Sequence, residues 1–253
     1  MPRPTIAAAL LATVALSGTA GVATAAPTVG MKVKVVSIPG FPHTGYIPGH
    51  GAAVEIQTTI KGSEYGGFPP PLVGFNAYLP KGVMVHPQGF PVCPLTSLEK
   101  TGACPAKSKA GPVGHALGVV SFGSERVPEE VSIQPYLASG GLEFYVQGRS
   151  PVALELISKG HFVPARGLFD EEFLGEIPLV ETVPGAPDAS AESITVTIGA
   201  AIVAHGKTLY YGKVPLTCPR GGYPVKAELT FAALGGLPAQ TVTTSLKVPC
   251  PKR

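Results

Sequence analysis

Four cysteines, Cys93, Cys104, Cys218 and Cys250, are the residues whose type and spacing imply chemistry most directly. An even number of cysteines in an exported chain indicates disulfide bonds. Three pairings are possible, and we favour Cys93–Cys104 with Cys218–Cys250 because each pair lies within one local block of sequence. Zinc binding is the competing interpretation, but the CxxC spacing of zinc sites is absent. We therefore expect two disulfides, no metal and no other cofactor.

A second candidate is the segment Ala201–Thr208, whose sequence AIVAHGKT is similar to a phosphate-binding loop. A loop of that kind begins with glycine, where this chain has Ala201, and it opens a helix. Here the apolar pattern of a strand runs into His205-Gly206-Lys207, which favours a strand followed by a turn. The motifs GxSxG and HExxH, typical of serine hydrolases and zinc proteases, do not occur in the sequence.

A loop rich in glycine and proline carries two histidines and two aromatic residues: Phe41, His43, Tyr46 and His50. Two histidines with a third ligand could hold a metal ion, and aromatic rings could form a ligand surface. A packed loop of turns with solvated histidines accounts for the same residues. The candidate ligand surface therefore consists of these four residues, and it stays a hypothesis beside the simpler interpretation.

The acidic residues gather in two short clusters, Glu125, Glu129 and Glu130 in one and Asp170-Glu171-Glu172 in the other. Glycosidases need two carboxyl groups that face each other across a cleft. Neighbouring acids are usually solvated, and we expect that here. No catalytic residue is therefore assigned. The pair Tyr210-Tyr211 points one ring to each face of a strand, so we expect one ring in the core.

The first 25 residues predict export. Arg3 precedes Ile6–Val22, a run rich in alanine, leucine and valine without a charged residue, and Ala23-Thr24-Ala25 gives the small-x-small pattern of a signal-peptidase site. We predict a signal peptide over residues 1–25 and a secreted chain over residues 26–253.

The small net charge of the chain limits the classes of binding partner that are expected. The chain has 19 Lys and Arg against 16 Asp and Glu, so removing Arg3 leaves 18 against 16, a net charge of +2. Nucleic acid and anionic membranes need dense basic patches, so neither is expected as the main partner. No segment after the leader is apolar enough to predict a membrane span.

Apolar and polar residues alternate with period two along most of the chain, as in Val54-Glu55-Ile56-Gln57 and in 142–147. This pattern predicts roughly a dozen half-buried strands and an all-β fold, an antiparallel β-sandwich. One helical turn is expected over Pro94–Thr101 inside the small disulfide loop, with Gly102 as its stop. Residues 159–191 read as the longest irregular connection. We expect one domain over 26–253, with a boundary near residue 110 as the alternative.

The sequence around Cys93 and Cys104 resembles that of other proteins. It reads Leu79-Pro80-Lys81-Gly82, then Gly89-Phe90-Pro91-Val92-Cys93, then Cys104-Pro105 followed by small and basic residues. These pieces resemble a group of uncharacterised exported all-β proteins from GC-rich bacteria. The resemblance implies export and a β fold, and it carries over no catalytic residues.

Together these features predict a secreted, disulfide-stabilised, non-catalytic protein with a binding or structural role outside the cell or at its envelope. Cell-wall glycan or another envelope protein is a conceivable partner. A secreted hydrolase acting on glycans is the alternative.

Overall fold

The computed structural model describes residues 26–85, 88–122, 125–150, 153–179, 189–233, 236 and 238–251. The expected signal peptide, residues 1–25, lies outside the described residues. Within the described part of the chain, no helix is both long enough and apolar enough to cross a membrane.

The main element is an antiparallel sheet of 11 strands. Its strands, in the order in which they pair, are β1 (Thr28–Val36), β2 (Ala53–Lys61), β10 (Ser190–Ile198), β5 (Gly114–Phe122), β6 (Glu125–Ala138), β7 (Gly141–Gly148), β8 (Leu154–Pro164), β9 (Phe169–Glu176), β3 (Leu72–Pro80), β14 (Tyr223–Phe231) and β15 (Gln240–Val248). Two small pairs accompany it: β11 (Ala201–Ala204) with β12 (Lys207–Tyr210), and β4 (Met84–Val85) with β13 (Gly212–Lys213).

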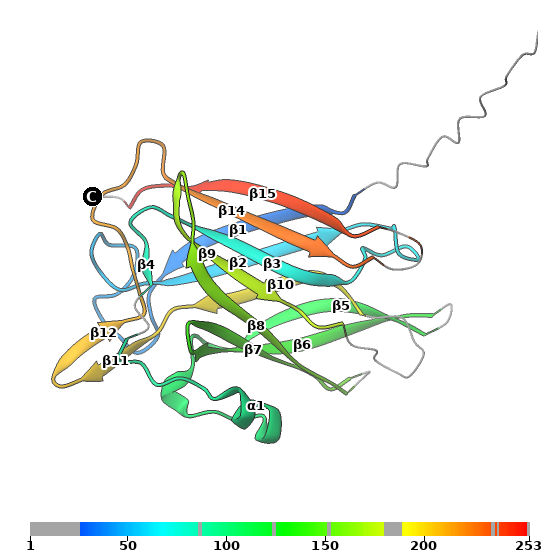
Figure 1. Ribbon diagram of the computed structural model, residues 1–253, viewed down its shortest axis with the longest axis horizontal. Helices are drawn as coiled ribbons and strands as arrows, with labels where there is room; N and C mark the ends of the chain where they lie inside the picture. The colour runs from blue at the N-terminus through cyan, green and yellow to red at the C-terminus, as the bar shows by residue number, and fades with distance from the viewer. Residues whose placement is uncertain are drawn as a thin grey trace, which may run out of the picture.

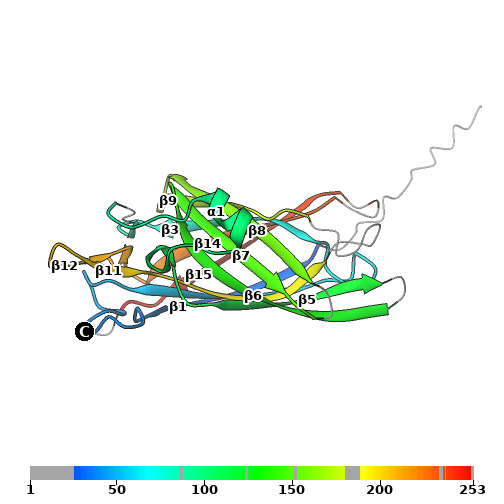
Figure 2. The same ribbon diagram turned by 90° about the horizontal axis from the view of Figure 1, so that it is seen from below.

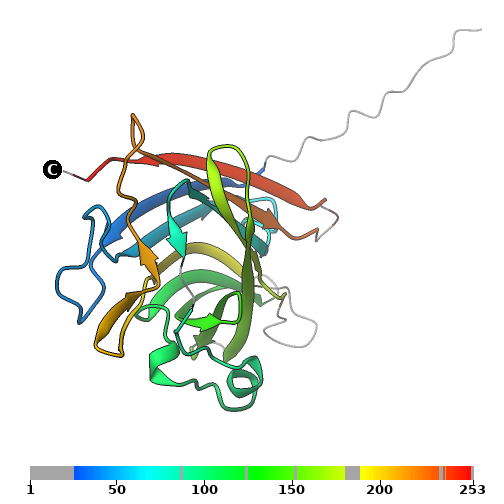
Figure 3. The same cartoon turned by 60° about the vertical axis from the view of Figure 1, so that its left-hand side comes forward.

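The sheet curls over itself into two facing layers (Figure 1). One layer contains β1, β2, β3, β14 and β15, and the other contains β5 to β8. The first and last strands, β1 and β15, come side by side, so the sheet is nearly closed, as the view in Figure 3 also shows. The expected all-β antiparallel architecture, with two layers packed face to face, is confirmed, and the sheet continues from one layer into the other.

The expected helical turn is α1 (Leu95–Thr101), and a 3₁₀ turn, η1 (Ala106–Ser108), follows it. Gly102 ends α1 in the left-handed region at φ 61°, where glycine has no steric cost. Leu98 is completely buried against Tyr136 and Tyr145. This contact holds α1 across the outer face of the layer formed by β6 to β8 (Figure 2).

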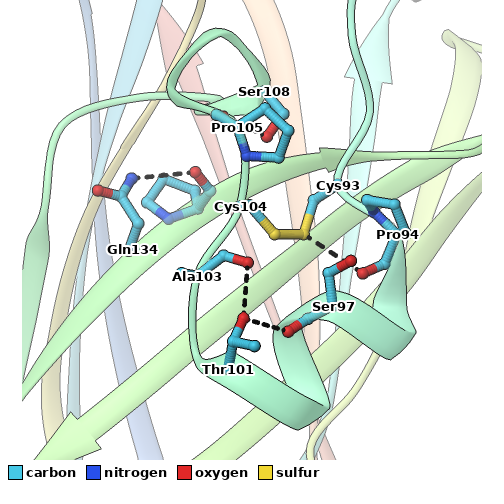
Figure 4. The surroundings of a disulfide bond; sticks show 10 residues. Cys93, Pro94, Ser97, Thr101, Ala103, Cys104, Pro105, Ser108 and Gln134 are labelled. Carbon is cyan, nitrogen blue, oxygen red and sulfur yellow. Dashed lines mark hydrogen bonds between the residues drawn. A yellow bond between two sulfur atoms is a disulfide. The ribbon is translucent and has the colours of Figure 1, made fainter.

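Both expected disulfides are present. Cys93–Cys104 joins the segments on either side of α1, as Figure 4 shows, and Cys218–Cys250 ties the segment before β14 to the end of the chain after β15. Among the described residues no cysteine is free.

The expectation of one irregular connection over residues 159–191 is wrong. The described part of that segment contains the end of β8, a tight turn at Gly167 with φ 75°, and all of β9. The pattern is misleading because β9 begins Phe169-Asp170-Glu171-Glu172, whose charges suit a helix start. Pairing with β8 on one side and β3 on the other stabilises it as a strand.

Candidate ligand-binding cavity

A cavity of about 340 Å³, partly open to solvent, lies between the two layers of the sheet. Its wall contains inward-facing aliphatic side chains, among them Ile56, Ile133, Val146, Leu156 and Val196. The register explains how they meet: Val196 pairs with Ile56, and Val146 lies between Ile133 and Leu156 on the neighbouring strands. Period-two alternation thus gathers apolar residues from several strands onto one inner surface.

The inner surface is not fully packed. Ile56, Val146, Leu156 and Val196 face the inside of the molecule, yet each is only partly buried. Inward-facing residues of a filled core normally lose nearly all of their solvent-accessible surface. The partial burial therefore means that these side chains border open space.

An aromatic cluster closes the cavity at the end where β6 ends and β7 begins. The ring of Phe173 packs against Phe144 at 6.1 Å and against Phe162 at 5.2 Å between centroids. Phe90 meets Tyr211 edge to face at 5.8 Å. These rings join Leu137 and Leu142 in one buried cluster. The arrangement gives this end a rigid apolar floor.

Tyr211 is the polar feature of that floor. Its side chain is 4% exposed and lines the cavity, and within the described residues its hydroxyl has no hydrogen-bond partner. Burial raises the pKa of Tyr211, and the negative charge of Glu171 raises it further. The hydroxyl therefore stays protonated and is held as a neutral group. The expectation that one ring of Tyr210-Tyr211 reaches the core is confirmed by Tyr211, while Tyr210 is half-buried beside Lys213.

Glu129 lies near the opposite end of the cavity, on β6. It is 3% exposed and lines the wall together with Ser190. Its carboxyl group lies over Gly148 of β7, where a Cβ would collide with Oε1. Ser190 donates its hydroxyl hydrogen to the carbonyl of Pro69 at 2.6 Å. A carboxyl group thus sits in a wall that is otherwise nearly all hydrocarbon.

The expectation that the cluster Glu125, Glu129 and Glu130 is solvated is wrong for Glu129, although its two companions are exposed. The period-two pattern indicates the burial of Glu129, because Glu129 has the same phase as Val131 and Ile133, which also face the cavity. Glu129 and Glu130 are adjacent on a strand, and adjacent strand residues point to opposite faces, so one is buried while the other is exposed. In the other cluster, Asp170 accepts a hydrogen bond from the backbone N–H of Gly82 at 2.8 Å.

The predicted ligand surface, Phe41, His43, Tyr46 and His50, lies in the loop between β1 and β2, outside the cavity. Nδ1 of His50 lies 2.8 Å from the carbonyl of His43, which has a left-handed φ of 63°. The Tyr46 hydroxyl donates to the carbonyl of Pro249, and burial raises the pKa of Tyr46. No cluster of three metal-ligating side chains occurs among the described residues. A ligand role for this loop stays a prediction.

The segment similar to a phosphate loop is a β-hairpin, as expected. Ala201–Ala204 pairs with Lys207–Tyr210, and His205 and Gly206 form the turn with φ values of 50° and 72°. Two consecutive positive φ angles are typical of the type I′ hairpin turn. A further hollow of about 420 Å³ beside α1 is a shallow, open depression lined by residues such as Thr96, Lys100 and Thr101, without the enclosure that small-molecule sites provide.

Comparison with protein-family models, curated proteins and solved structures finds no match to this chain.

Proposed function

We propose that this protein is a non-catalytic binding protein that holds an apolar small molecule, a lipid-like chain, in the cavity between its two layers. The observation that carries the proposal is the cavity of about 340 Å³ and its almost entirely hydrocarbon wall. Its volume falls in the range of ligand sites, which are apolar with a few placed polar groups.

Water is a poor occupant for this space. At roughly 30 Å³ per molecule the cavity would hold about eleven waters. Each buried water needs two to four polar partners, and side chains such as Ile56, Val146 and Val196 offer none. The polar side chains in the wall are few: Thr58, Glu129, Ser158, Ser190 and Tyr211.

An empty cavity is also costly. At about 24 cal/mol per Å³, a closed, dry void of this volume would correspond to about 8 kcal/mol, which is an upper limit for a cavity that is partly open to solvent. That is comparable to the whole free energy of unfolding of a typical domain. A hydrocarbon ligand would replace the missing dispersion contacts, so occupancy supports the stability of the fold.

The setting is extracellular in this proposal. Two disulfides indicate a non-reducing environment. Secretion rests on the leader sequence at residues 1–25, and the resemblance to exported proteins of GC-rich bacteria agrees with it. A glycan hydrolase would need two facing carboxyl groups, whereas the described wall of the cavity carries one, that of Glu129.

The test is a titration of the purified protein, stripped of lipid, with the neutral dye N-phenyl-1-naphthylamine, whose fluorescence rises in apolar sites. We expect saturable binding with one site. Val196→Phe, which fills the cavity, should weaken binding at least about tenfold, because the ring occupies the ligand's space.

The matched control is Thr195→Phe, which places the same ring on the opposite face of β10 and should leave binding unchanged. Native mass spectrometry of the protein before lipid removal should show a bound small molecule. Absence of dye binding, or equal loss in both variants, would contradict the proposal.

A further inference from the structure

The polar groups at the Glu129 end of the cavity are hydrogen-bond acceptors. The Ser190 hydroxyl already donates its hydrogen to Pro69, so its oxygen can only accept. The carboxylate of Glu129 accepts hydrogen bonds and has room for about four, so a ligand can be added to the contacts it already makes. A ligand group placed here must therefore donate.

Two glycines on the neighbouring strands make room for the Glu129 carboxyl group. Glu129 pairs with Gly118 on β5, and its carboxyl lies over Gly148 on β7, so glycines flank it on both sides. A Cβ at Gly118 would collide with the carbonyl oxygen of Ser190. Because neither glycine has a side chain, the Glu129 carboxyl can lie against the sheet and line the cavity. Larger side chains at these two positions would cover the carboxyl.

Burial makes this acid selective. A carboxylate that is 3% exposed has lost most of its hydration, so a cation or a strong donor nearby is favoured and a second negative charge is repelled. The opposite end of the cavity is closed by Phe173, Phe162 and their aromatic neighbours. The site is thus polar at one end and apolar along the rest of its length.

We propose that the ligand is a single-chain amphiphile with an amine head group, bound with its ammonium against Glu129 and its hydrocarbon chain along the cavity toward Phe173. This inference rests on the proposed function, since it assigns the head group of the ligand that the cavity holds. The ammonium donates to the Glu129 carboxylate, beside the contacts that this group already makes, and no covalent step is involved.

The experiment is displacement of N-phenyl-1-naphthylamine from the lipid-stripped protein by dodecylamine, dodecanol and dodecanoate, below the concentrations at which they form micelles. The three probes share one chain and differ in the head group. We expect dodecylamine to bind about tenfold or more tightly than dodecanol, and dodecanoate to bind most weakly.

Glu129→Gln should remove the advantage of dodecylamine over dodecanol, measured as the ratio of the two affinities in the same variant. Gly148→Ala should also reduce it, because the added Cβ displaces Oε1. The matched control is Glu130→Gln, which removes the neighbouring exposed carboxylate on the outer face of β6 and should retain the full preference.

The wild-type ranking tests the inference even if a variant fails to fold. If the dye binds but the three probes displace it with equal affinity, or dodecanoate displaces it best, the amine assignment is overturned and the cavity function still stands. A preference for dodecylamine that survives in Glu129→Gln, or one that is lost in Glu130→Gln, overturns it as well. If neither the dye nor any probe binds, both proposals fail.

Discussion

Replacing Val196 with phenylalanine tests whether the space between the layers is open in the folded protein. Val196 points into the cavity from β10 and is only partly buried. The phenyl ring should therefore extend into empty volume without pushing other atoms aside. Cavity-filling substitutions commonly add about 0.5–2 kcal/mol of stability.

The comparison variant is Ala227→Leu on β14. Ala227 has 0% exposure and packs among Ile60, Leu72 and Leu229. Added volume at such a site typically costs about 1–3 kcal/mol, because packed neighbours must move. The two variants thus insert larger side chains into the same fold and should change stability in opposite directions.

The assay is thermal unfolding of both lipid-stripped, oxidised variants, followed by circular dichroism. For a chain of this size each kcal/mol moves Tm by about 2–4 °C. We expect Val196→Phe to raise Tm by about 1–8 °C and Ala227→Leu to lower it by about 2–12 °C. A Val196→Phe variant destabilised as much as Ala227→Leu would refute the reasoning, since it would mean that the inner surface is packed.

Three further predictions concern the stability of the fold. Replacing Cys218 and Cys250 with serine should cost roughly 4 kcal/mol and replacing Cys93 and Cys104 roughly 3 kcal/mol in chemical denaturation, because the bonds close loops with sequence separations of 32 and 11 residues; equal losses would argue against loop entropy as the cause. Leu98→Ala should cost about 2–5 kcal/mol, since Leu98 is completely buried beneath α1, and faster proteolysis within residues 95–101 would locate the effect. Burial raises the pKa of Glu143, with Lys159 opposing and Glu99 adding to the shift, so the folded state holds this proton more tightly than the unfolded chain. Stability should therefore fall as pH rises from the ordinary value of 4.5 through the raised pKa; Glu143→Gln should be more stable than wild type at neutral pH and lose that advantage in acid, whereas an unchanged pH profile would contradict the assignment.

Much of the architecture could be predicted because it depends on local patterns. The phase of Val54 and Ile56 against Glu55 and Gln57 identifies a strand and its two faces. Pro94 and Gly102 mark the ends of a short helix within two residues of its observed bounds. The short separations within each cysteine pair favour the observed disulfides.

The candidate site could not be predicted in the same way. Alternation shows that Val146 and Gln147 point to opposite faces of β7, but neither residue type says what lies across from the inner face. The strand order places β10 between β2 and β5, which are far from it in sequence. Only that non-local pairing brings Ile56 next to Val196.

Local sequence accounts for the strands, the faces of those strands, the helical turn and the two disulfides, because each depends on residues within one block of the chain. The packing of the whole sheet, in contrast, determines that the inner faces enclose open space and that Glu129 borders it. The physical reason is that a strand's alternation fixes which side chains point inward, whereas the curvature and closure of the sheet fix how far the facing layer stands from them.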